Sequence, residues 1–315
     1  MKREFERIEA IRQRLARRSP DVQVGIGDDA AVLTPGTGSP VLTVDAGVEG
    51  VHFRRDLCTL RDAGYRSFMA AASDLAAMGA RPRAALLALI LPRDLTDEDL
   101  LRLVDGVAEA AADAGSPVAG GNLSSGGELS ITTTLVGEID GPPMLRSGAG
   151  DGEGIYVTGH VGAAALGLAL LEAGRAEDPD SNAQHCIRRW RRPMAALVAG
   201  QRLQGYATAC VDISDGLLQD LNHLCQASGT GAELHTDQLP LPDGFDALAA
   251  SLDADPLQIA LGSGDDYELL FTAPSSETAD GLATRIGHTT ATPGITILDE
   301  TGSPIDAPLT GYEHF

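Results

Sequence analysis

Residues 84–115 read AALLALILPRDLTDEDLLRLVDGVAEAAADAG, and they predict a buried strand followed by a helix. The eight apolar residues at the start have the length and the Leu and Ile content of a buried strand. Thr96-Asp97-Glu98-Asp99 resembles a capping box that opens a helix, and Gly115 supplies a stop after about residue 114. A strand followed by a helix is the repeating unit of α/β folds.

Strand and helix patterns alternate on both sides of this stretch, and an amphipathic helix is expected over residues 1–18. The other elements expected in the first half are strands at 30–33, 41–44, 118–119 and 130–136, and a helix at 60–78. Those expected in the second half are strands at 155–158, 209–213, 267–272 and 295–298, and helices at 163–172, 194–203, 216–227 and 277–286. Gly141-Pro142-Pro143 ends the first series. We therefore expect two α/β domains, 1–142 and 143–315, with the boundary between residues 141 and 154.

The composition excludes several classes of protein. The chain has 315 residues, of which 43% are hydrophobic and 22% charged, as in globular α/β proteins. A formal net charge of -22 argues against nucleic acid and anionic membranes as partners. The longest apolar run is too short to cross a bilayer, and the N-terminus lacks the apolar core of a signal peptide. The four cysteines are widely spaced, which is typical of reduced thiols and predicts a cytoplasmic protein.

The basic residues restrict the possible phosphate chemistry. Lys2 is the only lysine, and the other 22 cations are arginines. This excludes the phosphate loop of the Gly-x-x-x-x-Gly-Lys type and the strand lysine of protein kinases. Any phosphate chemistry must therefore depend on metal ions and arginine.

Clustered aspartates recur where expected strands end or helices begin, which is where sites are commonly built. The segments are Gly25-Ile26-Gly27-Asp28-Asp29, Thr43-Val44-Asp45, Ser73-Asp74-Leu75, Asp212-Ile213-Ser214-Asp215-Gly216 and Gly264-Asp265-Asp266. Asp74 is the most informative, because an apolar helical run continues after it and a carboxylate there needs a partner such as a cation. Oxygen ligands without a His-Cys cluster favour Mg²⁺, which in turn implies a nucleotide.

Two further segments are candidates for phosphate contact. Gly120-Gly121-Asn122, expected just after a short strand, offers exposed backbone N–H groups. Arg146 lies in the predicted inter-domain segment, where a guanidinium could form paired hydrogen bonds with ATP phosphates.

Taken in order from Phe5 to Phe315, these segments resemble the thiamine-monophosphate kinase family, which belongs to the superfamily of aminoimidazole ribonucleotide synthetase. The resemblance implies an N-terminal α/β domain that binds ATP and magnesium and joins the sheet of a second subunit in a barrel-like homodimer. It also implies a C-terminal α/β domain that completes the active site. The implied activity is Mg²⁺-dependent transfer of the γ-phosphoryl group of ATP to thiamine monophosphate.

The resemblance also assigns roles to individual residues. The implied ligands of several magnesium ions are Asp29, Thr43, Asp45, Asp74, Asp212 and Asp215, with Asp28 as a neighbouring alternative to Asp29. The implied ATP contacts are Gly121, Asn122, Arg146 and Ser214, and the implied substrate contacts are His52, Asp265 and Tyr312. Asp74 and Arg146 are the candidate catalytic residues.

Two departures from the family pattern leave alternatives open. Typical members carry Asp at Asn122 and Glu at Asp265. Because Asn offers magnesium a neutral oxygen, a weakly active or non-catalytic thiamine-phosphate binder is one alternative. The other is a related ATP-dependent synthetase that phosphorylates an amide or carbonyl oxygen. Relatives of that kind typically carry Lys soon after the Asp of the first strand, where this chain has His52.

Overall fold

The computed structural model describes residues 4–15, 17–274 and 281–306. The chain forms two compact units. Unit 1 comprises Met1–Leu75 and Ala80–Gly141, and unit 2 comprises Ala76–Gly79 and Pro142–Phe315. Among the described residues, no helix is long and apolar enough to span a membrane.

Unit 1 is built on a four-stranded sheet with the strand order β3-β6-β4-β5. Its strands are β3 (Ser39–Val48), β4 (Arg81–Leu91), β5 (Val118–Ser125) and β6 (Ser130–Ile139). β4 and β5 are parallel, whereas β6 is antiparallel to both β3 and β4. A separate two-stranded sheet pairs β1 (Val22–Val24) with β2 (Val32–Leu33).

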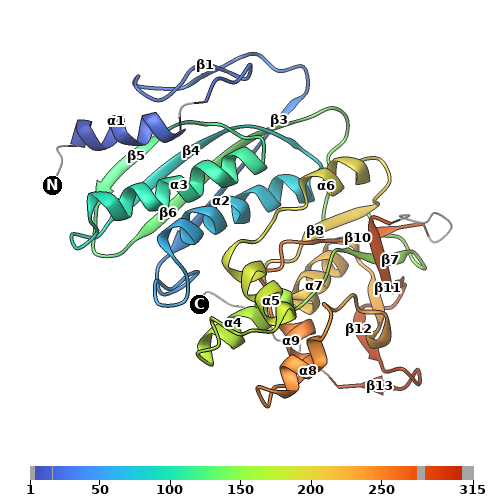
Figure 1. The fold of residues 1–315 in the computed structure, drawn as a ribbon. Helices are drawn as coiled ribbons and strands as arrows, with labels where there is room; N and C mark the ends of the chain where they lie inside the picture. Colours follow the sequence, from blue (N-terminus) through green and yellow to red (C-terminus); the bar gives the residue numbers. More distant parts are fainter. Residues whose placement is uncertain (1–3, 16, 275–280, 307–315) are drawn as a thin grey trace. The chain divides into compact units, whose positions relative to one another are not determined.

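Two long helices, α2 (Leu60–Ala77) and α3 (Asp97–Asp113), lie side by side along one face of this sheet (Figure 1). They approach closely at Gly106, where an added Cβ would lie 1.8 Å from the carbonyl oxygen of Arg61. The predicted capping box at the start of α3 is confirmed, because Thr96 and Asp99 exchange side-chain to backbone hydrogen bonds. The N-terminal helix α1 (Glu4–Leu15) packs against α3 and β5.

The opposite face of the unit 1 sheet carries exposed apolar side chains. Leu42 and Val44 in β3 are 69% and 63% exposed, and Leu86 and Ile90 in β4 are 39% and 41% exposed. The strand register places all four on one face, with β6 between the two strands. We call this surface the open face.

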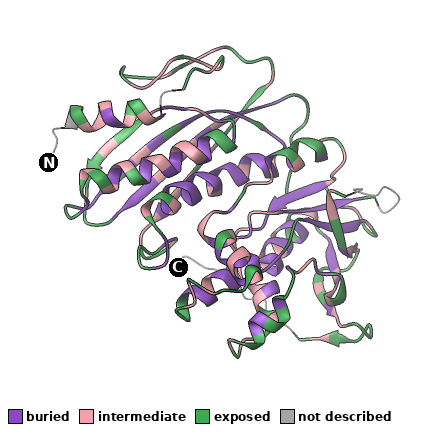
Figure 2. Cartoon of the chain, viewed as in Figure 1, coloured by how far each residue is buried: buried purple, intermediate pink, exposed green. Residues whose placement is uncertain are grey.

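Unit 2 is built on a seven-stranded sheet with the order β13-β12-β9-β11-β7-β10-β8. Its strands are β7 (Gly154–Thr158), β8 (Ala209–Asp212), β9 (Gly231–His235), β10 (Leu269–Ala273), β11 (Ala283–Thr290), β12 (Gly294–Leu298) and β13 (Pro304–Ile305). Its helices are α4 (Ala163–Glu172), α5 (Ser181–Arg191), α6 (Leu197–Leu203), α7 (Leu217–Ser228), α8 (Phe245–Ala250) and α9 (Pro256–Gly262), with the 3-10 turn η1 (Thr236–Gln238). Every residue of β7, β8 and β10 is buried, so these strands lie in the core of the unit (Figure 2).

The sequence predictions differ from the structure in several places. The helix predicted at 277–286 is wrong, because residues 283–286 belong to strand β11, whereas residues 275–280 lie outside the described part. β11 pairs with β7 and β9, and at Gly287 an added Cβ would lie 2.0 Å from the carbonyl oxygen of Glu233. Gly120-Gly121-Asn122 lies within β5 and not after it. Helices α5, α8 and α9 and strands β1, β9 and β13 were not predicted.

Candidate active site

In unit 1, β3 and α2 bring a hydroxyl and two carboxylates to one region. Thr43 and Asp45 alternate along β3 and project from the face that α2 and α3 cover. The Thr43 hydroxyl donates a hydrogen bond to Oδ2 of Asp74 in the last turns of α2. Oδ1 of Asp45 accepts the N–H of Ala46 at 2.7 Å. The structure thus joins two of the predicted metal ligands, Thr43 and Asp74, by a direct contact.

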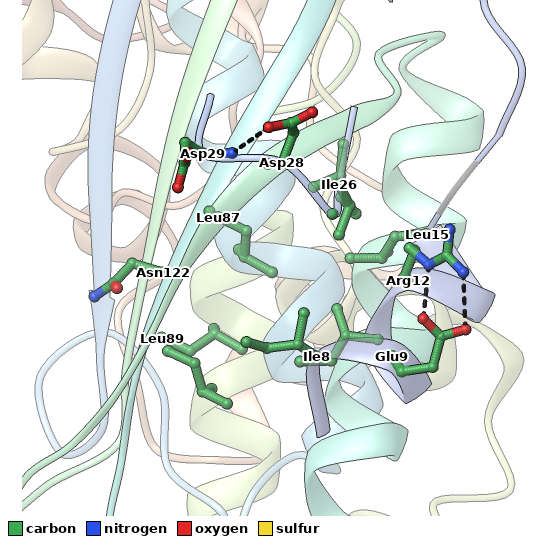
Figure 3. Close-up of a pocket in the computed structure, with 16 residues that line it drawn as sticks. Ile8, Glu9, Arg12, Leu15, Ile26, Asp28, Asp29, Leu87, Leu89 and Asn122 are labelled. Atoms are coloured by element: carbon green, nitrogen blue, oxygen red, sulfur yellow. Dashed lines mark hydrogen bonds and ion pairs between the residues drawn. The ribbon is translucent and has the colours of Figure 1, made fainter. Parts of the chain in front are cut away.

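A cavity of about 600 Å³ lies within unit 1, between α1, the turn after β1 and the edge strand β5 (Figure 3). Its apolar wall includes Ile8 and Leu15 from α1, and Leu87 and Leu89 from β4. Its polar lining comes from Glu9 and Arg12 of α1 and from the predicted site residues Asp28, Asp29, Gly121 and Asn122. Such a cavity combines an apolar wall with a few polar groups, as small-molecule sites do.

The predicted site residues that line this cavity differ in their contacts. The N–H of Asp29 donates to Oδ1 of Asp28 at 3.0 Å, and both side chains are exposed. Gly121 has no room for a side chain, since an added Cβ would lie 1.9 Å from the carbonyl oxygen of Leu87. Asn122 donates from Nδ2 to Oγ of Ser124 at 3.1 Å. Because Asn122 pairs with Ala88 in β4, its side chain is on the open face of the sheet, opposite to Thr43.

The loop after β3 fixes the ring of His52. Nδ1 of His52 accepts the N–H of Val48 at 3.1 Å, and the N–H of His52 donates to the carbonyl oxygen of Val48 at 2.9 Å. An accepting Nδ1 is unprotonated, so the neutral ring carries its proton on Nε2. The side chain is therefore oriented by backbone contacts within its own turn.

In unit 2, two loops at neighbouring strand ends are joined by backbone hydrogen bonds. Asp212 is buried at the end of β8 and pairs with Leu269 in β10. The N–H of Asp265 donates to the carbonyl oxygen of Ser214 at 2.9 Å. The Tyr267 hydroxyl donates to Oδ1 of Asp265 at 3.0 Å. Asp265 and Tyr267 have positive φ angles of 70° and 53°, a strained conformation that is typical of functional loops.

Sequence reasoning missed Asp220, which holds the loop that follows β8. Its Oδ2 accepts backbone N–H groups from Ser214, Asp215 and Gly216 at 3.0, 3.1 and 3.2 Å. Burial, together with the charges of Asp215 and Asp212, raises the pKa of Asp220 to about 7. Asp215, Asp220 and His223 each offer a ligand atom within 4.8 Å of the others. The sequence feature that could have revealed Asp220 is its position in the first turn of a helix that directly follows an Asp-Gly loop.

A second buried network, also missed, lies behind Asp265. Asp266 accepts the N–H groups of Gly162 and Ala164, at the start of α4, at 2.7 and 3.1 Å. Burial raises the pKa of Asp266 to about 7. Glu268 accepts from Arg189 at 2.8 Å and from Thr158 at 2.7 Å. Burial raises the pKa of Glu268, and the charge of Arg189 opposes that rise.

Comparisons with known proteins cover almost the whole chain. The family of AIR synthase related proteins matches twice, with its N-terminal domain over residues 27–139 and its C-terminal domain over residues 150–300. The thiamine-monophosphate kinase of Salmonella typhimurium is 36% identical over 324 residues, which cover 99% of this chain and 98% of that protein. The chain belongs to the thiamine-monophosphate kinase family.

Solved structures of that family have the same fold. The structure of AaThiL complexed with AMPPCP and TMP matches with a TM-score of 0.82 at 33% identity, over 99% of this chain and 97% of that chain. The thiamine-monophosphate kinase of Stenotrophomonas maltophilia K279a also matches with a TM-score of 0.82, at 34% identity, over 93% of this chain and 96% of that chain. The expectation of a two-domain α/β fold of the aminoimidazole ribonucleotide synthetase type is therefore confirmed.

Two predicted site residues of this thiamine-monophosphate kinase family member, Arg146 and Tyr312, lie outside the groups of residues described so far. Arg146 is exposed in unit 2, and its carbonyl oxygen accepts from the Ser228 hydroxyl at 3.3 Å. Tyr312 lies outside the described residues. The assignments of individual ligands and contacts stay predictions, but the structure links Thr43 to Asp74 and Ser214 to Asp265.

Proposed function

We propose that the chain transfers the γ-phosphoryl group of ATP to thiamine monophosphate and so produces thiamine diphosphate. The observation that carries this proposal is the similarity to thiamine-monophosphate kinases over 99% of the chain. The match to a structure described as complexed with AMPPCP and TMP supports the same pair of substrates.

The chemistry needs little covalent participation by the protein. The phosphate of the acceptor is already anionic at neutral pH, so its oxygen attacks the γ-phosphorus directly and no general base is required. The protein's task is to position two anions in line and to offset their repulsion. Two unit charges at about 4 Å repel by about 4 kcal/mol at an effective dielectric constant near 20.

The carboxylates and the hydroxyl described above suit Mg²⁺, a hard cation that prefers oxygen ligands. Thr43 and Asp74, already in contact, present a hydroxyl and a carboxylate, and Asp45 projects from the same face of β3. Asp29 in unit 1, and Asp212 and Asp215 in unit 2, are the other residues that would hold magnesium. When bound, magnesium ions neutralise charge on the phosphates. Asp220 keeps the loop of Asp215 in place through its backbone hydrogen bonds.

The remaining predicted residues bind and orient the substrates. In this proposal ATP contacts Gly121 and Asn122, in the strand that borders the cavity of unit 1, and Ser214 and Arg146 in unit 2. His52, Asp265 and Tyr312 contact thiamine monophosphate. The backbone contacts that hold His52 and Asp265 pre-organise two of these groups.

The open face supports the proposal of a homodimer. Four apolar side chains exposed together on one face of a sheet are unusual for a surface that stays in water. In light scattering the wild type should have the mass of a dimer. Leu42→Glu should give a monomer, because it puts a charge into an apolar interface. The matched control is Val198→Glu, an equally exposed apolar position at 65% in unit 2. A dimer that persists in Leu42→Glu would remove the open face from the proposal.

A cytoplasmic location is proposed on two grounds. All four cysteines are free and buried, which suits a reducing compartment. The co-substrate, ATP, is also supplied there.

The test is an assay of the purified full-length protein with ATP, Mg²⁺ and thiamine monophosphate, followed for both thiamine diphosphate and free phosphate. The expected result is stoichiometric formation of thiamine diphosphate and ADP without free phosphate. Binding of thiamine monophosphate without turnover would favour the non-catalytic alternative, and release of free phosphate would favour a synthetase. Unphosphorylated thiamine should be a very poor acceptor, because its alcohol needs a base to remove the proton.

A further inference from the structure

Two histidines and a glutamate converge on one face of the unit 2 sheet, in β9 and β11. Glu233 is directly opposite His288 in the antiparallel pair, and His235 follows Glu233 by two residues. Opposed residues, and residues two apart in a strand, project from the same face of a sheet. Ala232 and Leu234, which alternate with this pair in β9, are buried on the other face.

One ligand atom from each of the three side chains lies within 4.8 Å of the other two, which is close enough for a common ion. Nε2 of His235 lies 3.6 Å, and Nδ1 of His288 lies 3.8 Å, from Oε1 of Glu233. Ligand atoms at about 2.1 Å from a tetrahedral ion are about 3.4 Å apart. Both distances are longer than a hydrogen bond between nitrogen and oxygen. A contraction of a few tenths of an ångström would bring each nitrogen to the spacing from this oxygen that a tetrahedral ion requires.

The cluster is accessible to an ion from solution, and the two strands that carry it lie in the interior of the sheet. The side chains of His235, Glu233 and His288 are 28%, 32% and 35% exposed. β9 and β11 are interior strands of the sheet, because β12 pairs with β9 on one side and β7 pairs with β11 on the other. Sites on paired strands hold their ligands more accurately than sites on loops.

We propose that Glu233, His235 and His288 form a binding site for a divalent transition metal such as Zn²⁺. Two imidazoles and one carboxylate suit Zn²⁺, and water can complete the four-coordinate shell. Mg²⁺ prefers oxygen ligands alone, so the site differs in chemistry from the one proposed for phosphoryl transfer. An ion bound here links two strands that are distant in the sequence and stabilises the folded unit, because the unfolded chain lacks the preformed cluster.

Calorimetric titration of the full-length protein with Zn²⁺ tests this site, with saturating Mg²⁺ present to occupy oxygen-rich sites. We expect one Zn²⁺ to bind per chain, with an affinity at least about tenfold weaker in His235→Gln and in His288→Gln. The matched control is His160→Gln, an exposed histidine of the same unit outside the cluster. Zn²⁺ should raise the melting temperature of the wild type and of this control, and should have no such effect in the two cluster variants.

A second measurement on the wild type alone covers the case in which a variant fails to fold. With ¹⁵N-labelled histidine, sub-stoichiometric Zn²⁺ should shift the ring signals of two of the seven histidines. These should be the signals that His235→Gln and His288→Gln remove. Shifts confined to other histidines, unchanged Zn²⁺ binding in folded variants, or no Zn²⁺ binding at all would each overturn the site.

Discussion

Asp220 and Asp215 are joined by a hydrogen bond in which a buried carboxylate accepts a backbone N–H at 3.1 Å. The same oxygen of Asp220 accepts the N–H groups of Ser214 and Gly216. One side chain thus fixes the backbone of a loop that contains two predicted site residues, Ser214 and Asp215. Its negative charge also lies where three N–H dipoles converge, which offsets part of the cost of burying it.

Asp220→Asn should therefore lower turnover while the protein stays folded. The amide oxygen can still accept from the loop, but hydrogen bonds to a neutral acceptor are weaker than those to a carboxylate, so the loop is held less firmly. We expect a fall in kcat of about ten- to a hundredfold and a higher Mg²⁺ concentration at half-maximal rate. The control is Asp180→Asn, which alters the exposed cap of α5. Equal effects of the two variants on the Mg²⁺ requirement would show that Asp220 does not position the loop.

Asp74→Asn tests the contact between α2 and β3. The substitution keeps the shape that receives the Thr43 hydroxyl but removes the negative charge. We expect kcat to fall at least about a hundredfold, within the range for lost electrostatic stabilisation. Asp62→Asn, in the first turn of the same helix, is the control and should retain activity. Near-normal turnover of Asp74→Asn at saturating Mg²⁺ would contradict the metal-ligand assignment.

The sequence predicted those elements that are determined by residues close together in the chain, such as a helix cap or an apolar run. The capping box at Thr96 predicted α3 to within about a residue, and the apolar run before it predicted the end of β4, which begins three residues earlier than expected. The error at 283–286 arose because helix propensity is local, whereas β11 owes its conformation to strands β7 and β9, which are far from it in the sequence. Predictions from periodicity cannot detect such pairing.

The sequence supplied candidate residues for the site but none of the contacts between them. Asp74 stood out because a carboxylate at the start of an apolar run needs a partner, and the structure supplies Thr43 as one. Asp266 was missed as a helix cap because Gly162, whose N–H it accepts, is far away in the sequence. The cluster of Glu233 and His288 could not be predicted either, because the two residues are far apart in the sequence and meet only when β9 pairs with β11.

Asp266 should make stability depend on pH in a defined window. Its pKa is about 7 in the folded protein and 3.8 as a model group, so the folded state binds the proton more tightly. Stability contributed by this group is therefore full below about pH 4 and decreases as the pH rises towards 7. The raised pKa of Glu268 acts in the same direction.

Asp266→Asn should flatten the decrease in melting temperature between pH 5 and 7.5, measured in EDTA. The amide still offers one acceptor to α4 but has no proton to lose in this range. Asp255→Asn, which changes the exposed cap of α9, serves as the control and should keep the wild-type slope. Identical slopes for the wild type and Asp266→Asn would show that Asp266 does not titrate in this window.

The last prediction concerns Asn122, where typical family members carry Asp. Asn122 lies in β5 at the border of the cavity of unit 1, and its side chain is on the open face, where it donates to Ser124. A carboxylate here would offer magnesium a charged oxygen where the wild type offers a neutral one.

For Asn122→Asp we expect a lower Mg²⁺ concentration at half-maximal rate, with the largest gain when magnesium is limiting, because an anionic oxygen attracts the cation more strongly. The KM for thiamine monophosphate should change less. Ser124→Asp is the matched control, since it puts the same charge two residues along the same face of β5. If both variants lower the Mg²⁺ requirement equally, the effect is one of general charge and not of a ligand position. A higher requirement in Asn122→Asp alone would show that the added charge repels ATP, and that asparagine is the adapted ligand at this position.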